Sequence, residues 1–285
     1  MKILIGDSGS TKTDWAYLYE NEVKYFTTQG LNPNYLSTTD IQSILVQQTL
    51  SNVEHPPEHL FFYGAGLNNI HSKSLMYAVF EKVFPHSQLS IEHDLLGAAR
   101  AVYGLCESGI ICILGTGSIA GFYDGERIPK TMGGLGYLLG DEGSGTHLGK
   151  MLIAQYAQKQ LPRQIENALY EQIQIKTNDI LHFLYQQKYP NRFLAQLTHF
   201  IAMYRENEAI QDIVRRSFQS FCEQTLLPLA NQCFQRLKIR CVGSIAHIFE
   251  QEWKAVLLKN GMKVDKIMRK PISGLVEHVR HWVKS

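Results

Sequence analysis

The stretch Ile5-Gly6-Asp7-Ser8-Gly9-Ser10-Thr11-Lys12-Thr13 decides the fold, because it places glycine, hydroxyl and acidic residues between two strand-like runs. The run Lys2–Gly6 leads into it, and Thr13–Tyr19 follows with partial alternation of large side chains. Strand-forming runs joined by a short loop that contains glycine are typical of a β-hairpin. The stretch therefore predicts a hairpin loop and not the entrance to a helix.

The same pattern returns about 110 residues later in the chain. The apolar run Ile110–Leu114 leads into Gly115-Thr116-Gly117-Ser118, and Ile119–Tyr123 returns as a strand. Two copies of strand, glycine-rich hairpin and strand indicate a duplicated architecture. We expect a boundary near Ser108-Gly109, with an N-terminal domain at 1–109 and a C-terminal domain at 110–285.

The segments that follow each hairpin alternate between strands and helices. In the first half we predict strands at 23–28, 60–63 and 88–93, and helices at 41–50, 74–84 and 95–103. In the second half we predict a helix at 141–158, further helices to 237, strands at 239–242 and 262–264, and a helix at 271–283. Alternation of this kind indicates the α/β class.

Composition excludes several classes of protein. The chain has 285 residues, 45% hydrophobic content and a net charge of +2, which allows two cores and implies no nucleic-acid surface. No apolar run approaches the ~18 residues of a membrane span, and the short apolar start does not resemble a secretory signal, so we expect a cytoplasmic protein. We expect buried, reduced thiols without a metal site from the five scattered cysteines, Cys106, Cys112, Cys222, Cys233 and Cys241.

Glycine-rich loops with hydroxyl or acidic residues are suited to phosphate, because glycine permits close approach and successive N–H groups bind anions. Gly6–Thr13 lacks the second glycine of a Walker A loop, and Gly115, Gly117 and Gly121 miss the dinucleotide spacing. In both places a strand follows where those motifs require a helix. The loops are therefore phosphate cradles of another type, or simple turns.

Several motifs resemble one known superfamily, in its order and over nearly the whole chain. The run Asp7–Thr13 resembles the first phosphate loop of the actin/Hsp70/sugar-kinase superfamily, Leu114–Ser118 its second loop, and Val242–Ala246 its adenosine motif. The run Gly133-Gly134-Leu135-Gly136-Tyr137-Leu138-Leu139-Gly140-Asp141-Glu142-Gly143-Ser144-Gly145 is similar to the signature of N-acetylglucosamine kinases, which are grouped with the BadF/BadG/BcrA/BcrD ATPases.

The resemblance implies two ribonuclease-H-like domains, each with a mixed sheet, and a cleft between them for ATP and Mg²⁺. It also implies that the helix at 271–283 could pack on the first domain. It implies ATP-dependent phosphorylation of an amino sugar, with N-acetylglucosamine favoured. Asp94 would be the catalytic base, unless it is only a helix N-cap, and Asp7 would hold Mg²⁺ through water. The implied cofactor-binding residues are Ser10, Thr11, Lys12, Thr13, Gly115, Thr116, Gly117, Gly243 and Ser244. The implied substrate-binding residues are Asn34, Gly66, Thr116, Gly117, Ser118, Gly136, Asp141 and Glu142.

Alternatives remain open at this point. Asn32 is an alternative to Asn34 as the asparagine that would bind the sugar. The acids Asp141 and Glu142 could serve only as charges at a helix N-terminus. Leu135 and Ile119 stand where relatives commonly carry other residues. The protein could instead be an ATPase that activates a partner enzyme, or a non-catalytic sugar- and ATP-binding module. An ATPase of the activating type needs cysteines near the loop at Gly115–Ser118, which has none. A non-catalytic module predicts loss of Asp94, which is present. The expected partner is a small sugar, not a nucleic acid or a membrane, and a homodimer stays open.

Overall fold

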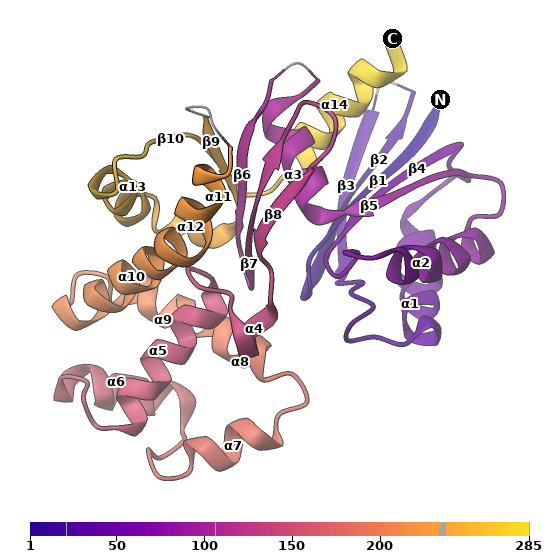
Figure 1. Ribbon diagram of the computed structural model, residues 1–285. Helices are drawn as coiled ribbons and strands as arrows, with labels where there is room; N and C mark the ends of the chain where they lie inside the picture. Colours follow the sequence, from indigo (N-terminus) through magenta and orange to yellow (C-terminus); the bar gives the residue numbers. More distant parts are fainter. Residues whose placement is uncertain (21, 106, 234–237, 285) are drawn as a thin grey trace. The chain divides into compact units, whose positions relative to one another are not determined.

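The computed structural model describes residues 1–20, 22–105, 107–233 and 238–284. The chain forms two compact units, coloured by sequence in Figure 1. Unit 1 comprises Met1–Ser108, Tyr123–Ile128 and Lys270–Ser285, and unit 2 comprises Gly109–Phe122 and Pro129–Arg269. Each unit has its own sheet and its own hydrophobic core.

Unit 1 contains a five-stranded mixed sheet in the order β3-β2-β1-β4-β5. Its strands are β1 (Lys2–Ser8), β2 (Lys12–Tyr19), β3 (Glu22–Gln29), β4 (His59–Gly64) and β5 (Gln88–His93). β1, β2 and β3 form an antiparallel meander, whereas β4 runs parallel to β1 and β5 parallel to β4. The predicted opening meander and the two later strands are confirmed.

The helices of unit 1 pack around this sheet. They are α1 (Thr38–Ile44), which continues into a π-helical turn at Leu45–Thr49, α2 (Ile70–Val83), α3 (Asp94–Tyr103) and α14 (Ile272–Lys284). α14 lies against α3 so closely that a Cβ on Gly274 would come within 2.3 Å of the Ala101 carbonyl oxygen. The core beneath α1 and α2 includes Trp15, Phe62 and Phe80, all fully buried.

Unit 2 repeats the strand order of unit 1, as β10-β9-β6-β7-β8. Its strands are β6 (Gly109–Leu114), β7 (Ser118–Tyr123), β8 (Lys130–Gly133), β9 (Ile239–Val242) and β10 (Val264–Met268). β9 runs parallel to β6 and to β10, and β7 pairs with β8 in antiparallel fashion. The α/β class with one mixed sheet in each half is confirmed, although β10 begins later than the predicted 262–264.

The remainder of unit 2 is helical. Its helices are α4 (Gly136–Leu139), α5 (Gly145–Ala157), α6 (Arg163–Ile173), α7 (Ile180–Gln186), α8 (Pro190–Gln196), α9 (Thr198–Met203), α10 (Glu208–Phe221), α11 (Leu227–Asn231), α12 (Ser244–Ile248) and α13 (Glu250–Lys259). The prediction that a helix starts at Asp141 is wrong, because α5 begins at Gly145. Ser144 is its N-cap and accepts a hydrogen bond from the His147 amide, whereas Asp141 has a left-handed backbone with φ 63°.

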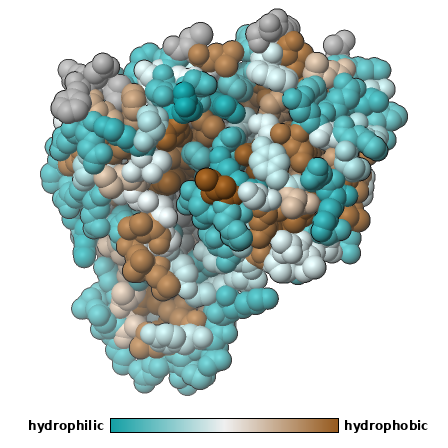
Figure 2. Space-filling model, turned by 45° about the vertical axis from the view of Figure 1, so that its right-hand side comes forward, coloured by the Kyte–Doolittle hydropathy of each residue, from teal (hydrophilic) through white to brown (hydrophobic). Residues whose placement is uncertain are grey.

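Figure 2 shows apolar residues scattered among hydrophilic ones on the face in view. None of the helices formed by the described residues has the length and apolar character needed to cross a membrane. Cys112, Cys222 and Cys241 are free and buried, as predicted, whereas Cys233 is only half-buried. Cys106 lies outside the described residues.

Candidate functional site

The first glycine-rich loop is a tight turn that is held from one side by Gly30. The Gly9 amide donates to the Lys12 carbonyl at 3.0 Å, and the Gly30 amide donates to the Thr11 carbonyl at 3.1 Å. A Cβ on Gly30 would lie 2.4 Å from the Gly9 oxygen, so no larger residue fits there. The Thr11 amide donates to no other described residue, and it is therefore available to an anion.

The hydroxyl groups of this loop differ in whether they are hydrogen-bonded within the sheet or lie at the tip of the loop. Thr13 is buried and donates to Ser8 Oγ at 2.8 Å, while Ser8 Oγ accepts from the Leu31 amide at 2.9 Å. Thr11 lies exposed at the tip of the loop, and Ser10 Oγ accepts from Asn32 Nδ2 at 3.0 Å. Of the predicted cofactor-binding hydroxyls, that of Thr13 is therefore engaged within the sheet.

Two carboxylates lie at the same edge of the unit 1 sheet. Ser8, Gly64 and His93 form one row of paired residues across the carboxyl ends of β1, β4 and β5. Asp7 directly precedes Ser8 in the chain, and Asp94 directly follows His93. Burial, reinforced by the negative charge of Asp94, raises the pKa of Asp7 to about 8. Burial also raises the pKa of Asp94 to about 6, although the Leu95 amide partly opposes this. The sheet thus carries two buried acids of raised pKa at one edge.

Asp94 is the first residue of α3 and not its cap. The cap is His93, whose Nδ1 accepts a hydrogen bond from the Leu96 amide at 3.3 Å. Burial, with the nearby charge of Lys73, lowers the pKa of His93, which keeps this nitrogen available as an acceptor. The N-cap alternative for Asp94 is therefore wrong, because a neighbouring side chain fills that role.

Asp14 joins two lysines beside this carboxylate pair. It faces Asp7 across the β1–β2 ladder, and its oxygens lie 3.0 Å from Lys12 Nζ and 3.0 Å from Lys270 Nζ. Burial opposes ionisation of Asp14, but the hydrogen bonds from both lysines outweigh it, and the pKa of Asp14 is lowered. Sequence reasoning missed Asp14 and Lys270, because 256 positions separate them and neither belongs to a recognisable motif.

A polar corner forms where the Asn32–Asn34 turn meets the end of β4. Asn32 Oδ1 accepts from the Asn34 amide at 2.9 Å, and Asn32 Nδ2 donates to Ser10, so both polar atoms of the buried Asn32 side chain have a partner. Asn34 is exposed, and a Cβ on Gly66 would lie 2.4 Å from Asn32 Oδ1 and 3.0 Å from Asn34 Nδ2. The structure therefore brings Asn34 and Gly66 together and favours Asn34 over Asn32 as the asparagine available to a ligand.

The second glycine-rich loop, Gly115–Ser118 in unit 2, is held in place by hydrogen bonds that its carbonyl groups accept. The amide of Gly145 donates to the Gly115 carbonyl at 2.9 Å, and that of Thr146 donates to the Thr116 carbonyl at 3.2 Å. The amides of Thr116 and Gly117 donate to no other described residue. Two successive N–H groups of this kind on one loop are suited to binding an anion.

Asp141 and Glu142 connect this loop to the glycine-rich run. Asp141 is buried and its Oδ1 accepts from the Ser118 amide at 3.3 Å, while Ser118 Oγ donates to the Glu142 carbonyl at 2.6 Å. A Cβ on Gly117 would lie 3.0 Å from Asp141 Oδ2. Burial raises the pKa of Asp141, partly opposed by the Ser118 amide. The structure thus engages the Ser118 hydroxyl and the Asp141 carboxylate internally, in holding the loop.

The glycine-rich run itself presents apolar side chains outward. Leu135, Leu138 and Leu139 are 64%, 78% and 79% exposed. Lys150 Nζ donates to the Tyr137 carbonyl at 2.7 Å and so ties α4 to α5, a role that the sequence did not suggest. Gly136 adopts φ 77° with open space around it, which is the left-handed backbone that glycine allows.

Gly243 and Ser244 lie where β9 ends and α12 begins. A Cβ on Gly243 would come within 2.2 Å of the Leu114 carbonyl oxygen, and its φ is 126°. Ser244 is exposed. Only glycine fits this strand-to-helix turn, which lies directly beside the end of β6 and the start of the second loop.

The donor set of unit 1 fits a magnesium–nucleotide and not a fully protein-bound metal. No group of three or more His, Cys, Asp or Glu side chains gathers around a common point in the described part of the chain. Mg²⁺ is usually held by one or two carboxylates together with substrate phosphates and water. Asp7 can supply such a carboxylate, and a cation beside it would offset the burial and the negative charges that raise its pKa.

The chain is similar to several solved structures, while no family model and no curated protein matches it. It shares 33% identity and a TM-score of 0.90 with the Putative N-acetylglucosamine Kinase from Porphyromonas gingivalis, over 98% of this chain and 99% of that one. It shares 15% identity and a TM-score of 0.75 with the Putative N-acetylglucosamine Kinase from Chromobacterium violaceum, over 98% of each chain. It shares 13% identity and a TM-score of 0.59 with a ROK family glucokinase from Streptomyces griseus in complex with glucose and AMPPNP, over 100% of each chain.

The last two similarities show a common fold, and the first also shows common descent. Identity of 33% extends over nearly the full length of both chains. The order of the glycine-rich loops along this sequence agrees with that relationship. The chain therefore belongs to the N-acetylglucosamine kinase-like family of sugar kinases, among the BadF/BadG/BcrA/BcrD ATPases of the actin/Hsp70/sugar-kinase superfamily.

Proposed function

We propose that the protein transfers the γ-phosphoryl group of ATP to a hydroxyl of an amino sugar, with N-acetylglucosamine as the favoured acceptor. The observation that carries this proposal is the pair Asp7 and Asp94, two acids of raised pKa at the sheet edge from which the first loop emerges. The name of the Porphyromonas gingivalis relative supports the sugar, and the AMPPNP in the Streptomyces griseus glucokinase supports the nucleotide.

Asp94 is the proposed general base. A base with a pKa of about 6 is largely ionised at neutral pH, and it can orient a sugar hydroxyl and accept its proton as the oxygen attacks phosphorus. Its place at the first position of α3 favours the ionised form, because the helix N-terminus carries partial positive charge. Asn34 and the turn at Gly66, which belong to the same unit as Asp94, are proposed to hold sugar hydroxyls near it. Gly136 and Glu142 of the glycine-rich run stay predicted sugar contacts.

The proposed phosphate contacts come mainly from backbone groups. The free amides of Thr11, Thr116 and Gly117 can donate to phosphate oxygens, and Lys12 can neutralise their charge. Mg²⁺ held at Asp7 would supply further charge neutralisation. We propose Gly243 and Ser244 for the adenosine, because they lie in the run that resembles the adenosine motif and Ser244 is exposed beside the start of the second loop.

A coupled assay of ADP release tests this proposal. The enzyme is incubated with ATP and Mg²⁺ and with N-acetylglucosamine, glucosamine, N-acetylmannosamine or glucose. We expect N-acetylglucosamine to stimulate ADP release most strongly and to yield one sugar phosphate per ADP. Sugar-independent ADP release that none of the acceptors changes would favour the ATPase alternative and would contradict the kinase proposal.

A further inference from the structure

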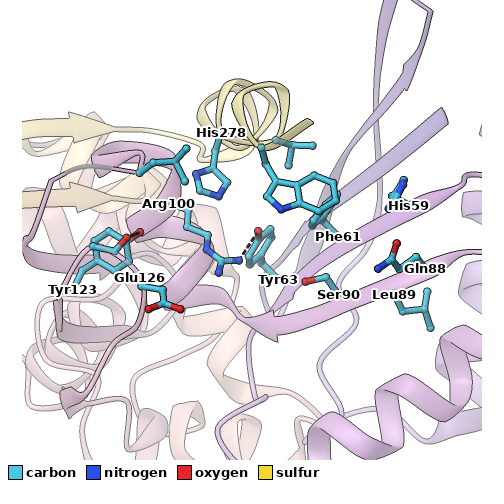
Figure 3. A pocket seen from close by; sticks show the side chains of 14 residues that line it. His59, Phe61, Tyr63, Gln88, Leu89, Ser90, Arg100, Tyr123, Glu126 and His278 are labelled. Carbon is cyan, nitrogen blue, oxygen red and sulfur yellow. Dashed lines mark hydrogen bonds between the residues drawn. The ribbon is translucent and has the colours of Figure 1, made fainter. Parts of the chain in front are cut away.

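A cavity of about 340 Å³ lies within unit 1, apart from the loops and carboxylates described above. Its walls come from β4, β5, the last turn of α3, the hairpin at Tyr123–Glu126 and α14. Figure 3 shows the side chains of Arg100, Tyr63 and His278 on its walls. The volume falls at the lower end of the range for small-molecule sites.

The cavity holds a guanidinium group that has no negative partner among the residues the structure describes. Arg100 Nη1 donates to Tyr63 Oη at 3.1 Å, and the Arg100 side chain forms no ion pair with any residue that the structure describes. Guanidinium groups carry five N–H donors, and they bind carboxylate or phosphate oxygens in pairs. One neutral acceptor therefore leaves most of the donor capacity of Arg100 unused.

His278 supplies an independent sign of a missing acceptor. Its side chain is more than nine-tenths buried, and its Nδ1 has no hydrogen-bond partner, which is unusual for a buried polar atom. The imidazole extends from α14 toward Arg100 (Figure 3). Burial lowers the pKa of His278 to about 4, and the positive charge of Arg100 adds to this. A ligand oxyanion would accept from Arg100 and from the Nδ1–H form of His278 together.

The rest of the wall suits an organic ring. The rings of Phe61 and Trp282 pack edge to face with their centroids 5.2 Å apart. The neutral polar side chains of Gln88 and Ser90 also line the cavity. Glu126 is the one carboxylate on the lining, but its side chain is 80% exposed at the rim and lies 3.8 Å from Arg127. A rim charge in water is well screened.

We propose that this cavity is a second ligand site, which takes a small organic anion with a carboxylate or phosphate on Arg100 and His278 and a ring against Trp282. The site goes beyond the proposed kinase reaction and does not depend on it. α3 connects the two places, because Asp94 begins this helix and Arg100 lies six residues further along it, a rise of about 9 Å.

Tryptophan side-chain resonances of the full-length ¹⁵N-labelled protein give a local test. The chain has three tryptophans, of which Trp15 and Trp253 are fully buried and Trp282 is 42% exposed. Titration with glucose 6-phosphate and with glucuronate should move the Trp282 indole signal saturably, whereas neutral glucose should not move it. The two anions distinguish a phosphate site from a carboxylate site.

Two substitutions test whether the positive charge of Arg100 holds a negatively charged ligand. Arg100→Gln should weaken binding roughly tenfold or more, because a charge-assisted contact is lost. Glu126→Lys, at an exposed position where folding is safe, should change binding little, because a charge at the rim is screened by water. Unchanged Trp15 and Trp253 signals show that each variant is folded. The proposal is overturned if neither anion moves the Trp282 signal, if glucose moves it equally, or if Arg100→Gln binds both anions as tightly as the native protein.

Discussion

Asp94→Asn should abolish catalysis and stabilise the protein at the same time. The pKa of Asp94 is raised from 3.8 to about 6, so the folded state holds a carboxylate that prefers to be protonated. A difference of about two pH units corresponds to roughly 3 kcal/mol, at 1.36 kcal/mol per unit. This is the free energy that folding loses at pH 8, where the carboxyl group is ionised in both states.

The sign of the effect depends on pH. Because the folded pKa of Asp94 lies above the unfolded one, its protonated form favours folding at low pH, and this advantage is lost as the pH rises through about 6. The neutral asparagine avoids that loss. We therefore expect Asp94→Asn to raise the free energy of unfolding by up to about 3 kcal/mol at pH 8 and by well under 1 kcal/mol near pH 4.

Chemical denaturation and the ADP-release assay measure the two sides of this prediction. Loss of a general base should lower kcat roughly 100-fold or more, while the affinity for ATP stays nearly unchanged. Asp124→Asn is the matched control, because hydrogen bonds from the amides of Arg127 and Glu126 lower the pKa of Asp124, and its replacement should not stabilise the protein. An Asp94→Asn variant that is less stable than the native protein at pH 8, or that keeps its turnover, would refute the reasoning.

Three further predictions concern the charges and loops of the site. First, kcat should rise with pH through about 6 as Asp94 ionises, and a pH–rate profile that is flat between acid and neutral pH would contradict the assigned base. Second, Gly243→Ala should destabilise the protein by roughly 1–3 kcal/mol, because the new Cβ would meet the Leu114 oxygen at 2.2 Å with φ 126°, whereas Gly115→Ala, which meets nothing within 4 Å, should change the denaturation midpoint much less. Third, Lys270→Met should raise the KM for ATP several-fold with little change in the acceptor KM, and equal changes in both would argue against a role near phosphate.

Local sequence features predicted much of the fold. Glycine between two strand-forming runs identified both hairpin loops, at Gly9 and at Gly115, because a hairpin depends on residues that are close in the chain. The recurrence of that pattern predicted two similar sheets, and the structure shows the same strand order in both. Asp94 was selected as the base from its place after a buried strand, and that role stays a prediction.

Features that depend on distant or competing contacts could not be predicted. Lys270 reaches Asp14 only because α14 returns to unit 1, which no local pattern encodes. The adjacent acids Asp141 and Glu142 are typical of a helix N-terminus. The buried hydrogen bond from the Ser118 amide nevertheless holds Asp141 in a left-handed turn before α5. The cavity around Arg100 combines five separate segments of unit 1, and none of them carries a motif.

The central claim is that the protein phosphorylates an amino sugar, and ³¹P NMR of a reaction with ATP, Mg²⁺ and N-acetylglucosamine tests it most directly. We expect a new sugar-phosphate resonance to grow in step with ADP, and we expect it to be absent with the Asp94→Asn variant. Formation of ADP and inorganic phosphate alone, or no reaction with any amino sugar while ATP still binds, would contradict the claim.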